Sequence, residues 1–198
     1  MVDLGIYYDN VNEASDTYLK YLIKDCEKNN ISYEICHNAR EWLSSTSKTE
    51  LYLEPVLDPW IDSMKYNEHN VDIPSATAQG IYDYITKNCP DRSTTIAVIG
   101  RGLVGKQLID KLIDYGYTVC EFNSKSNIYD MRDFCVYMTD IVVGLATEQL
   151  FDKNDCDVVL DNGAVFIDAA NNFDTRNKLR CGKWTRDIII DRIKERKE

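Results

Sequence analysis

The feature that most constrains the fold is a glycine-rich turn between a strand pattern and a helix pattern. Residues 94–99 are a nearly continuous β-favouring run, typical of a strand buried on both faces of a parallel sheet. Gly100-Arg101-Gly102-Leu103-Val104-Gly105 follows at once, and residues 104–115 have helical periodicity. In such a G-x-G-x-x-G turn the glycines permit a tight bend, a close approach of backbone to pyrophosphate, and packing of helix on strand. The pattern predicts a dinucleotide site at the helix N-terminus; the alternative is a glycine-rich turn without a ligand.

The rest of the second half of the chain alternates helices with strands. We expect helices over residues 76–87, 128–138 and 186–197, and strands over residues 117–122, 140–143 and 164–169. Asn88-Cys89-Pro90 closes the first of these helices, and Gly116 ends the helix that follows the glycine turn. Alternation of this kind implies right-handed βαβ crossovers, and therefore a Rossmann-like, doubly wound parallel sheet.

The first 70 residues predict a smaller α/β layer. We expect strands over residues 4–8, 31–36 and 50–53, and a helix over residues 15–28. Between Pro55 and Pro74 the periodicity disappears among Pro, Asp, Asn and Glu residues, which indicates a connection. The sequence therefore predicts an α/β protein of two domains, a small one over residues 1–73 and a Rossmann-like one over residues 74–198 that includes the C-terminal helix.

Composition excludes several classes of protein. Lys and Arg number 23 against 33 Asp and Glu, and the resulting charge of −10 disfavours binding to nucleic acid. The longest apolar runs are shorter than the roughly 20 residues that a membrane span needs, and no secretory signal is visible, so we expect a cytoplasmic protein. Seven cysteines without a C-x-x-C pair, and only two histidines, argue against a disulfide framework and against a metal site.

The end of the strand after the glycine turn selects the cofactor. A carboxylate there accepts a hydrogen bond from the ribose of NAD, and cationic or hydroxyl side chains favour the ribose phosphate of NADP. Glu121 lies 21 residues after Gly100 and favours NAD, whereas Arg101, Ser124 and Lys125 favour NADP. Both cofactors stay open, and the alternative for Glu121 and Lys125 is a solvated surface position.

Several motifs in order resemble one enzyme family. Residues 98–105, Val-Ile-Gly-Arg-Gly-Leu-Val-Gly, resemble the V-I-G-R-S-x-I-V-G stretch of methylenetetrahydrofolate dehydrogenase/cyclohydrolase enzymes. Five other segments are similar to family motifs: residues 14–19 to A-S-x-x-Y-V, 77–80 to T-P-x-G, 123–126 to H-S-x-T, 139–143 to A-D-I-V-V, and 163–168 to G-A-V-V-I-D. The similarity spans roughly residues 4–182.

The resemblance implies an NAD(P)-dependent oxidoreductase of one-carbon metabolism. It implies a cleft between two α/β domains, with the small domain on the substrate side, a tetrahydrofolate substrate, and a homodimer. By the same resemblance Tyr18 is the catalytic residue that orients the methylene bridge, with Glu54 and Asp72 as substrate-binding residues. Gly100, Gly102 and Gly105 hold the cofactor's pyrophosphate. The alternative for Tyr18 is an aromatic residue on the buried face of the first helix.

The departures from the family concern its second activity. The family's cyclohydrolase step uses a lysine four residues after the tyrosine, and this chain has Leu22 there. Lys20 and Lys24 lie off that helical face, so the resemblance implies a dehydrogenase without cyclohydrolase activity. The family's G-G-V-G-P segment is also replaced, by residues 171–184. Two alternatives stay open: a non-catalytic nucleotide- or folate-binding relative acting in regulation or interaction, and an NAD(P) oxidoreductase acting on another small acid.

Overall fold

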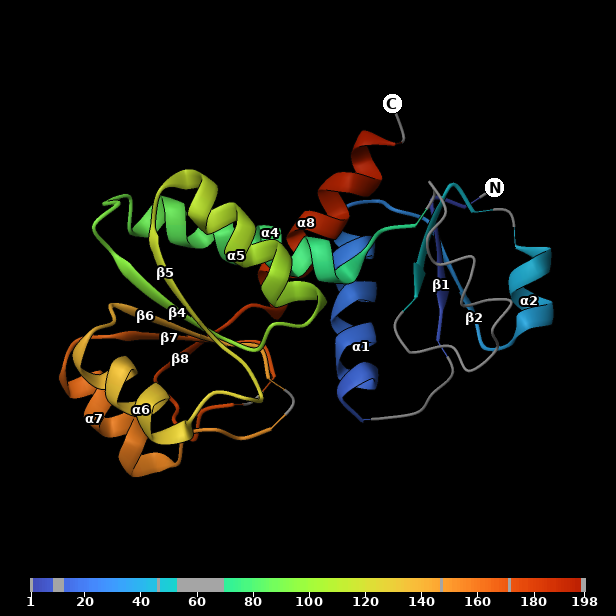
Figure 1. Ribbon diagram of the computed structural model, residues 1–198. Helices are drawn as coiled ribbons and strands as arrows, with labels where there is room; N and C mark the ends of the chain where they lie inside the picture. Colours follow the sequence, from blue (N-terminus) through green and yellow to red (C-terminus); the bar gives the residue numbers. More distant parts are fainter. Residues whose placement is uncertain are drawn as a thin grey trace. The chain divides into compact units, whose positions relative to one another are not determined.

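The chain folds into two compact units. The computed structural model describes residues 2–8, 13–45, 47–52, 70–146, 148–170 and 172–196. The first unit comprises Met1–Ala76 and Arg186–Glu198, and the second comprises Thr77–Thr185. The division falls inside two helices, α4 (Ile73–Asn88) and α8 (Gly182–Glu195), which are drawn green and red in Figure 1. Each unit is described by itself below.

The first unit is built on a small parallel sheet. Its elements are β1 (Leu4–Tyr7), α1 (Glu13–Lys28), β2 (Tyr33–Cys36), α2 (Ala39–Ser44) and β3 (Thr49–Tyr52). The strand order is β2-β1-β3, with Leu4 of β1 opposite Tyr33 on one side and Thr49 on the other. β1 is therefore the central strand, and all four of its residues are buried.

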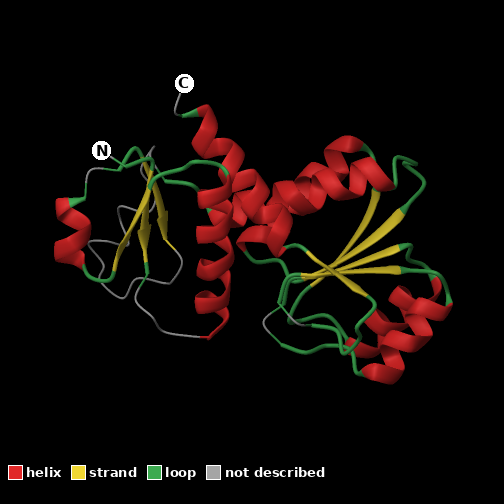
Figure 2. Ribbon diagram, turned by 180° about the vertical axis from the view of Figure 1, so that it is seen from behind, coloured by secondary structure: helices red, strands yellow, loops and turns green. Residues whose placement is uncertain are grey.

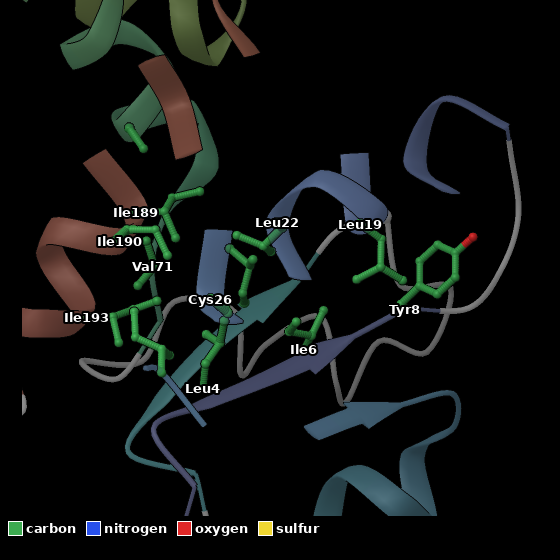
Figure 3. Packing of buried hydrophobic residues seen from close by; sticks show 13 residues of the cluster. Leu4, Ile6, Tyr8, Leu19, Leu22, Cys26, Val71, Ile189, Ile190 and Ile193 are labelled. Carbon is green, nitrogen blue, oxygen red and sulfur yellow. The ribbon is translucent and has the colours of Figure 1, made fainter. Parts of the chain in front are cut away.

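The core of this unit joins β1 to α1 and to the C-terminal part of α8. Leu4 and Ile6 pack with Leu22 of α1, and Ile189 and Ile193 of α8 complete the cluster (Figure 3). The apolar face of α8 thus lies in the first unit, whereas the sequence prediction places residues 186–198 in the second domain. A helical pattern predicts an apolar face but does not name the element that will cover it.

The second unit contains a doubly wound sheet. Its further elements are β4 (Thr95–Ile99), α5 (Leu103–Tyr115), β5 (Thr118–Phe122), α6 (Ile128–Tyr137), β6 (Ile141–Gly144), α7 (Lys153–Asp161), β7 (Val165–Asp168) and β8 (Lys178–Arg180). The strand order is β5-β4-β6-β7-β8, and every pair is parallel. This topology confirms the predicted α/β class with a Rossmann-like sheet.

Alternation along the central strands creates two cores, one on each face of the sheet. Ile96 and Val98 pack with the cluster that contains residues of α4 and α5, whereas Ala97 and Ile99 pack with residues of α6 and α7. Figure 2 shows these helix pairs on opposite faces of the five-stranded sheet. Burial on both faces explains why residues 94–99 read as a continuous apolar run rather than an alternating one.

The structure contains every strand and helix that the sequence predicts, with small shifts of the bounds, and adds α2, α7 and β8. The expected connection between Pro55 and Pro74 falls largely on residues 53–69, which lie outside the described residues. Within the described part of the chain, no helix combines the length and the apolar character that crossing a membrane requires.

Candidate nucleotide-binding site

The strand order of the second unit reverses beside β4. β5 pairs with one edge of β4 and β6 pairs with the other, so the chain leaves the carboxyl ends of β4 and β6 in different directions. Ligands of doubly wound sheets bind in the crevice at this reversal. A cavity of about 420 Å³ lies here, and its lining includes Ile99 and Gly100 at the end of β4.

Gly100 occupies a position where only glycine fits. Its φ is +112°, a conformation that residues with a side chain rarely adopt. A Cβ at this position would also lie 2.8 Å from the backbone nitrogen of Ala146. The Gly100 N–H donates to the carbonyl oxygen of Phe122 at 2.8 Å, which ties the turn to the end of β5.

Gly105 and Gly102 differ in the space around them. A Cβ on Gly105 would lie 1.9 Å from the carbonyl oxygen of Gly100, so the first turn of α5 packs directly on the glycine turn. A Cβ on Gly102 would meet nothing within 4 Å. Gly102 caps α5 without a side-chain hydrogen bond, and its carbonyl oxygen accepts from the Lys106 N–H at 3.0 Å. A side chain at Gly102 would therefore point into open space at the start of α5, and helix N-termini are common pyrophosphate sites.

Of the predicted cofactor-selecting residues, Glu121, Ser124 and Lys125 lie at or after the end of β5, and Arg101 lies in the glycine turn after β4. Arg101 Nε lies 3.3 Å from Glu121 Oε2, and both side chains are largely exposed. An exposed ion pair is worth about 0–1 kcal/mol, so the guanidinium can leave Glu121 for a phosphate at little cost. Ser124 lines the cavity. Lys125 is exposed, and its N–H donates to Asn123 Oδ1 at 2.9 Å.

A tight turn holds Ser124 at the edge of the cavity. The Asn123 N–H donates to Ser126 Oγ at 3.0 Å, and the Ser126 N–H donates to the Asn123 carbonyl oxygen at 2.9 Å. Asn123 and Ser126 also line the cavity. This turn therefore fixes a short polar rim whose hydroxyl and amide groups suit a ribose.

The remaining wall of the cavity was not predicted from the sequence. It is formed by Ile128 and Met131 of α6 and by Ala146, Glu148 and Leu150 after β6. These residues are distant from the glycine turn along the chain and match no nucleotide motif. The available signal is topological, because the segment after a strand that neighbours β4 must lie beside the glycine turn.

Tyr18, the predicted catalytic residue, lies on α1 in the first unit. Its side chain is partly buried, and the Arg186 guanidinium carbon lies 5.8 Å from the centroid of its ring. Arg186 is also 5.1 Å from the ring centroid of Tyr21, and its Nε lies 2.6 Å from Asp25 Oδ2. An arginine of α8 thus packs over the aromatic residues of α1.

The side chain of Leu22 is buried among the apolar residues of the first unit (Figure 3). The two nearby lysines of α1 do not replace a lysine at this position. Lys20 is exposed, and Lys24 Nζ lies 5.8 Å from the ring centroid of Tyr21. No amine therefore occupies the position where the family resemblance implies one.

The two predicted substrate-binding carboxylates are placed differently. Asp72 is exposed just before α4, and its Oδ2 accepts a hydrogen bond from the Ser75 N–H at 3.3 Å. This contact caps the helix, which is a structural use of the carboxylate. Glu54 lies outside the described residues.

The cysteines of the described chain are free thiols. Burial raises the pKa of Cys26 and of Cys135 to about 12, and that of Cys181 to about 11. These thiols are therefore protonated at neutral pH and unsuited to nucleophilic chemistry. Within the ranges that the structure describes, no three His, Cys, Asp or Glu side chains form a group that could hold a metal ion.

Among the comparisons with known proteins, only the one with solved structures found similar proteins. No family model matches the sequence, and no curated protein matches it. Solved structures of bifunctional methylenetetrahydrofolate dehydrogenase/cyclohydrolase enzymes match 98% of the chain at 15% identity. The Trypanosoma brucei enzyme, in complex with NADP and an inhibitor, gives a TM-score of 0.71 over 85% of its own chain. The Campylobacter jejuni enzyme gives a TM-score of 0.69 over 86% of its own chain. The Thermoplasma acidophilum enzyme gives a TM-score of 0.66 over 89% of its own chain.

Such similarity at 15% identity concerns the fold. It covers both units of the chain, and so confirms at the level of the fold the family resemblance that the motifs indicate. The chain has the fold of the methylenetetrahydrofolate dehydrogenase/cyclohydrolase enzymes.

Proposed function

We propose that the chain is an NAD(P)-dependent dehydrogenase of methylenetetrahydrofolate that lacks cyclohydrolase activity. The observation that carries the proposal is the open space in front of Gly102 at the N-terminus of α5. Gly100 of the same turn lines a cavity of about 420 Å³ where the strand order reverses. The fold shared with folate dehydrogenases supports the choice of substrate.

In this proposal the chain binds and orients, and the cofactor supplies the redox chemistry. The N–H groups at the start of α5 bind the pyrophosphate, and Ser124 with Arg101 or Glu121 binds the adenosine ribose. Tyr18 orients the methylene bridge of the folate, with Asp72 and Glu54 as further substrate contacts. When bound, a nicotinamide would supply the hydride acceptor, so the protein itself needs mainly to bind and orient the cofactor and the substrate.

The absence of cyclohydrolase activity follows from Leu22. Hydrolysis of the bridging carbon needs a group that exchanges a proton with water, and an alkyl side chain in an apolar core cannot do so. Hydride transfer does not need this group, because the nicotinamide carries the reaction. Loss of one activity and retention of the other are therefore compatible on this scaffold.

A spectrophotometric assay tests the proposal directly. Methylenetetrahydrofolate is added with NAD or with NADP, and the absorbance of the reduced nicotinamide is followed. We expect turnover with at least one coenzyme. If methylenetetrahydrofolate does not turn over but a coenzyme raises the melting temperature, the binding-protein alternative is favoured; if neither coenzyme shifts the melting temperature, the glycine turn is only structural.

The second candidate is a nucleotide- or folate-binding relative that acts in regulation or interaction. The burial of Leu22 favours it, because part of the family's catalytic apparatus is then replaced by core packing. It shares the nucleotide site with the dehydrogenase but predicts no turnover. The assay above therefore separates the two candidates.

Glu121→Ala is expected to shift the coenzyme preference toward NADP. The substitution removes a negative charge near the ribose and releases Arg101 for a ribose phosphate. We expect the ratio of NADP to NAD affinity to rise by roughly tenfold, equivalent to about 1.4 kcal/mol. Calorimetric titration with both coenzymes measures the ratio, and Asp110→Ala on the exposed side of α5 is the control. An unchanged ratio would show that Glu121 does not contact the ribose and is only a solvated surface residue.

We also propose a cytoplasmic homodimer. β5 is one of the two edge strands of the five-stranded sheet, and within the described chain it pairs with β4 alone. Tyr129 and Tyr137 of α6 are exposed aromatic residues. Uncovered strand edges and apolar residues are usual components of interfaces between copies of a chain. Analytical ultracentrifugation should give twice the mass of one chain, and a single-chain mass would contradict the proposal.

A further inference from the structure

Asn172 is a fully buried polar residue that follows β7. Its side-chain Nδ2 donates to two carbonyl oxygens, that of Ala146 at 2.7 Å and that of Glu148 at 2.6 Å. Its own carbonyl oxygen accepts from the N–H groups of Leu150 at 2.9 Å and Phe151 at 3.2 Å. One residue thus makes four hydrogen bonds to the chain that follows β6.

The chain that Asn172 holds is a wall of the candidate nucleotide site. Ala146, Glu148 and Leu150 line the 420 Å³ cavity, and we call residues 145–146 and 148–150 the β6 segment. The segment also abuts the glycine turn, since a Cβ on Gly100 would lie 2.8 Å from the Ala146 nitrogen. Asn172 itself is not a lining residue of the cavity, so it acts on the site through the β6 segment.

A buried ion pair holds Asn172 from the other side. The Asn172 N–H donates to Asp168 Oδ1 at 3.0 Å, and Asp168 Oδ2 lies 2.6 Å from Lys178 Nζ. The two charged side chains are 1% and 8% exposed. Lys178 Nζ also donates to the Phe173 carbonyl oxygen at 2.6 Å. The last residue of β7 and the first residue of β8 thereby hold Asn172 in place.

The hydrogen bonds specify an amide at this position. The Ala146 and Glu148 carbonyl oxygens both need a donor, and the Asn172 amide nitrogen carries two hydrogens. Asn172 Oδ1 lies 2.7 Å from the point that a Cβ on Gly144 would occupy, so the glycine at position 144 leaves the space that the amide oxygen fills. An aspartate of the same size has no donor to offer when ionised.

We infer that Asn172 is a positioning residue of the cofactor site, which sets the β6 segment against the bound nucleotide by holding the Ala146 and Glu148 carbonyl groups. The inference rests on the proposed coenzyme site. It adds to that site a residue that touches no cofactor and that the glycine motif does not include. Its effect is on coenzyme affinity, since preorganised walls reduce the ordering cost of binding.

Asn172→Asp tests the inference. We expect NADP and NAD to bind roughly tenfold or more weakly in calorimetry, at a temperature where circular dichroism reports a folded protein. Asn162→Asp is the matched control, because Asn162 is exposed and its Nδ2 donates to a single carbonyl oxygen, that of Val158 at 2.9 Å. Affinity unchanged in Asn172→Asp, or reduced equally in Asn162→Asp, overturns the inference. Absence of coenzyme binding by the wild-type protein instead overturns the proposed function.

A measurement on the wild-type protein covers the case in which Asn172→Asp does not fold. The Leu150 and Phe151 amides, which donate to Asn172, are followed by hydrogen exchange with and without saturating NADP. We expect their exchange to slow by roughly tenfold in the complex, because the nucleotide packs against the segment that they anchor. Equal exchange rates with bound NADP would show that the nucleotide does not pack against the segment that Asn172 holds, and would overturn the inference.

Discussion

Gly102→Val is expected to abolish coenzyme binding and to leave the protein folded. The new side chain would fill the space in front of α5, where a Cβ meets nothing within 4 Å, and would exclude a pyrophosphate from the helix N–H groups. Gly102 has a φ of −74°, which valine also adopts, so the backbone is not strained. We expect a loss of affinity of roughly 100-fold or more in calorimetry, with little change in the melting temperature.

Two other variants sharpen this prediction. Asp110→Val puts the same side chain on an exposed position of α5 and should bind coenzyme normally. Gly105→Ala should instead destabilise the fold, because its Cβ would lie 1.9 Å from the Gly100 carbonyl oxygen. If Gly102→Val binds either coenzyme with wild-type affinity, the glycine turn is not part of a nucleotide site.

Leu22→Lys is expected to destabilise the protein without creating cyclohydrolase activity. Leu22 is fully buried with Leu4, Ile6 and Ile189, and its replacement puts an ammonium group among alkyl side chains. Loss of apolar burial together with a buried unpaired charge should lower the free energy of unfolding by about 3–5 kcal/mol. Chemical denaturation measures this loss. We expect no cyclohydrolase activity because the side chain at this position is packed among core residues.

The control for this variant is Thr17→Lys, at an exposed position of the same helix. It should change the free energy of unfolding by less than about 0.5 kcal/mol. A Leu22→Lys protein as stable as the wild type would show that the side chain reaches solvent. Cyclohydrolase activity in the wild-type protein would contradict the inference that Leu22, in place of a lysine, removes this activity.

Local patterns were sufficient to predict most of the second unit. The run of residues 94–99 and the glycine turn determine β4 and the start of α5, because a buried parallel strand and a helix N-terminus each impose residue types within a few positions. Gly116, which is left-handed at φ +105°, ends α5 where the sequence predicts it. The order of these elements was then enough to predict the doubly wound sheet.

Elements with weak local signals were missed. The apolar residues of α7 are Cys156 and the consecutive Val158, Val159 and Leu160. The clearest signal of this helix is the capping box between Asp152 and Asp155, which a search for apolar periodicity does not detect. β8 has three residues and α2 has six, too few for a period to be recognised. Such elements depend on their neighbours, as β8 depends on its pairing with β7.

The sequence by itself determined the glycine turn between β4 and α5, because three glycines within six residues impose their conformational and steric requirements locally. Only the tertiary structure decided what surrounds that place. Asn172 reaches Ala146 and Glu148 across 26 and 24 residues of sequence, through contacts that no local pattern encodes. It also decided that the apolar face of α8 is buried with β1, because the hydrophobic effect is non-directional and any apolar surface of the right shape could have covered that helix.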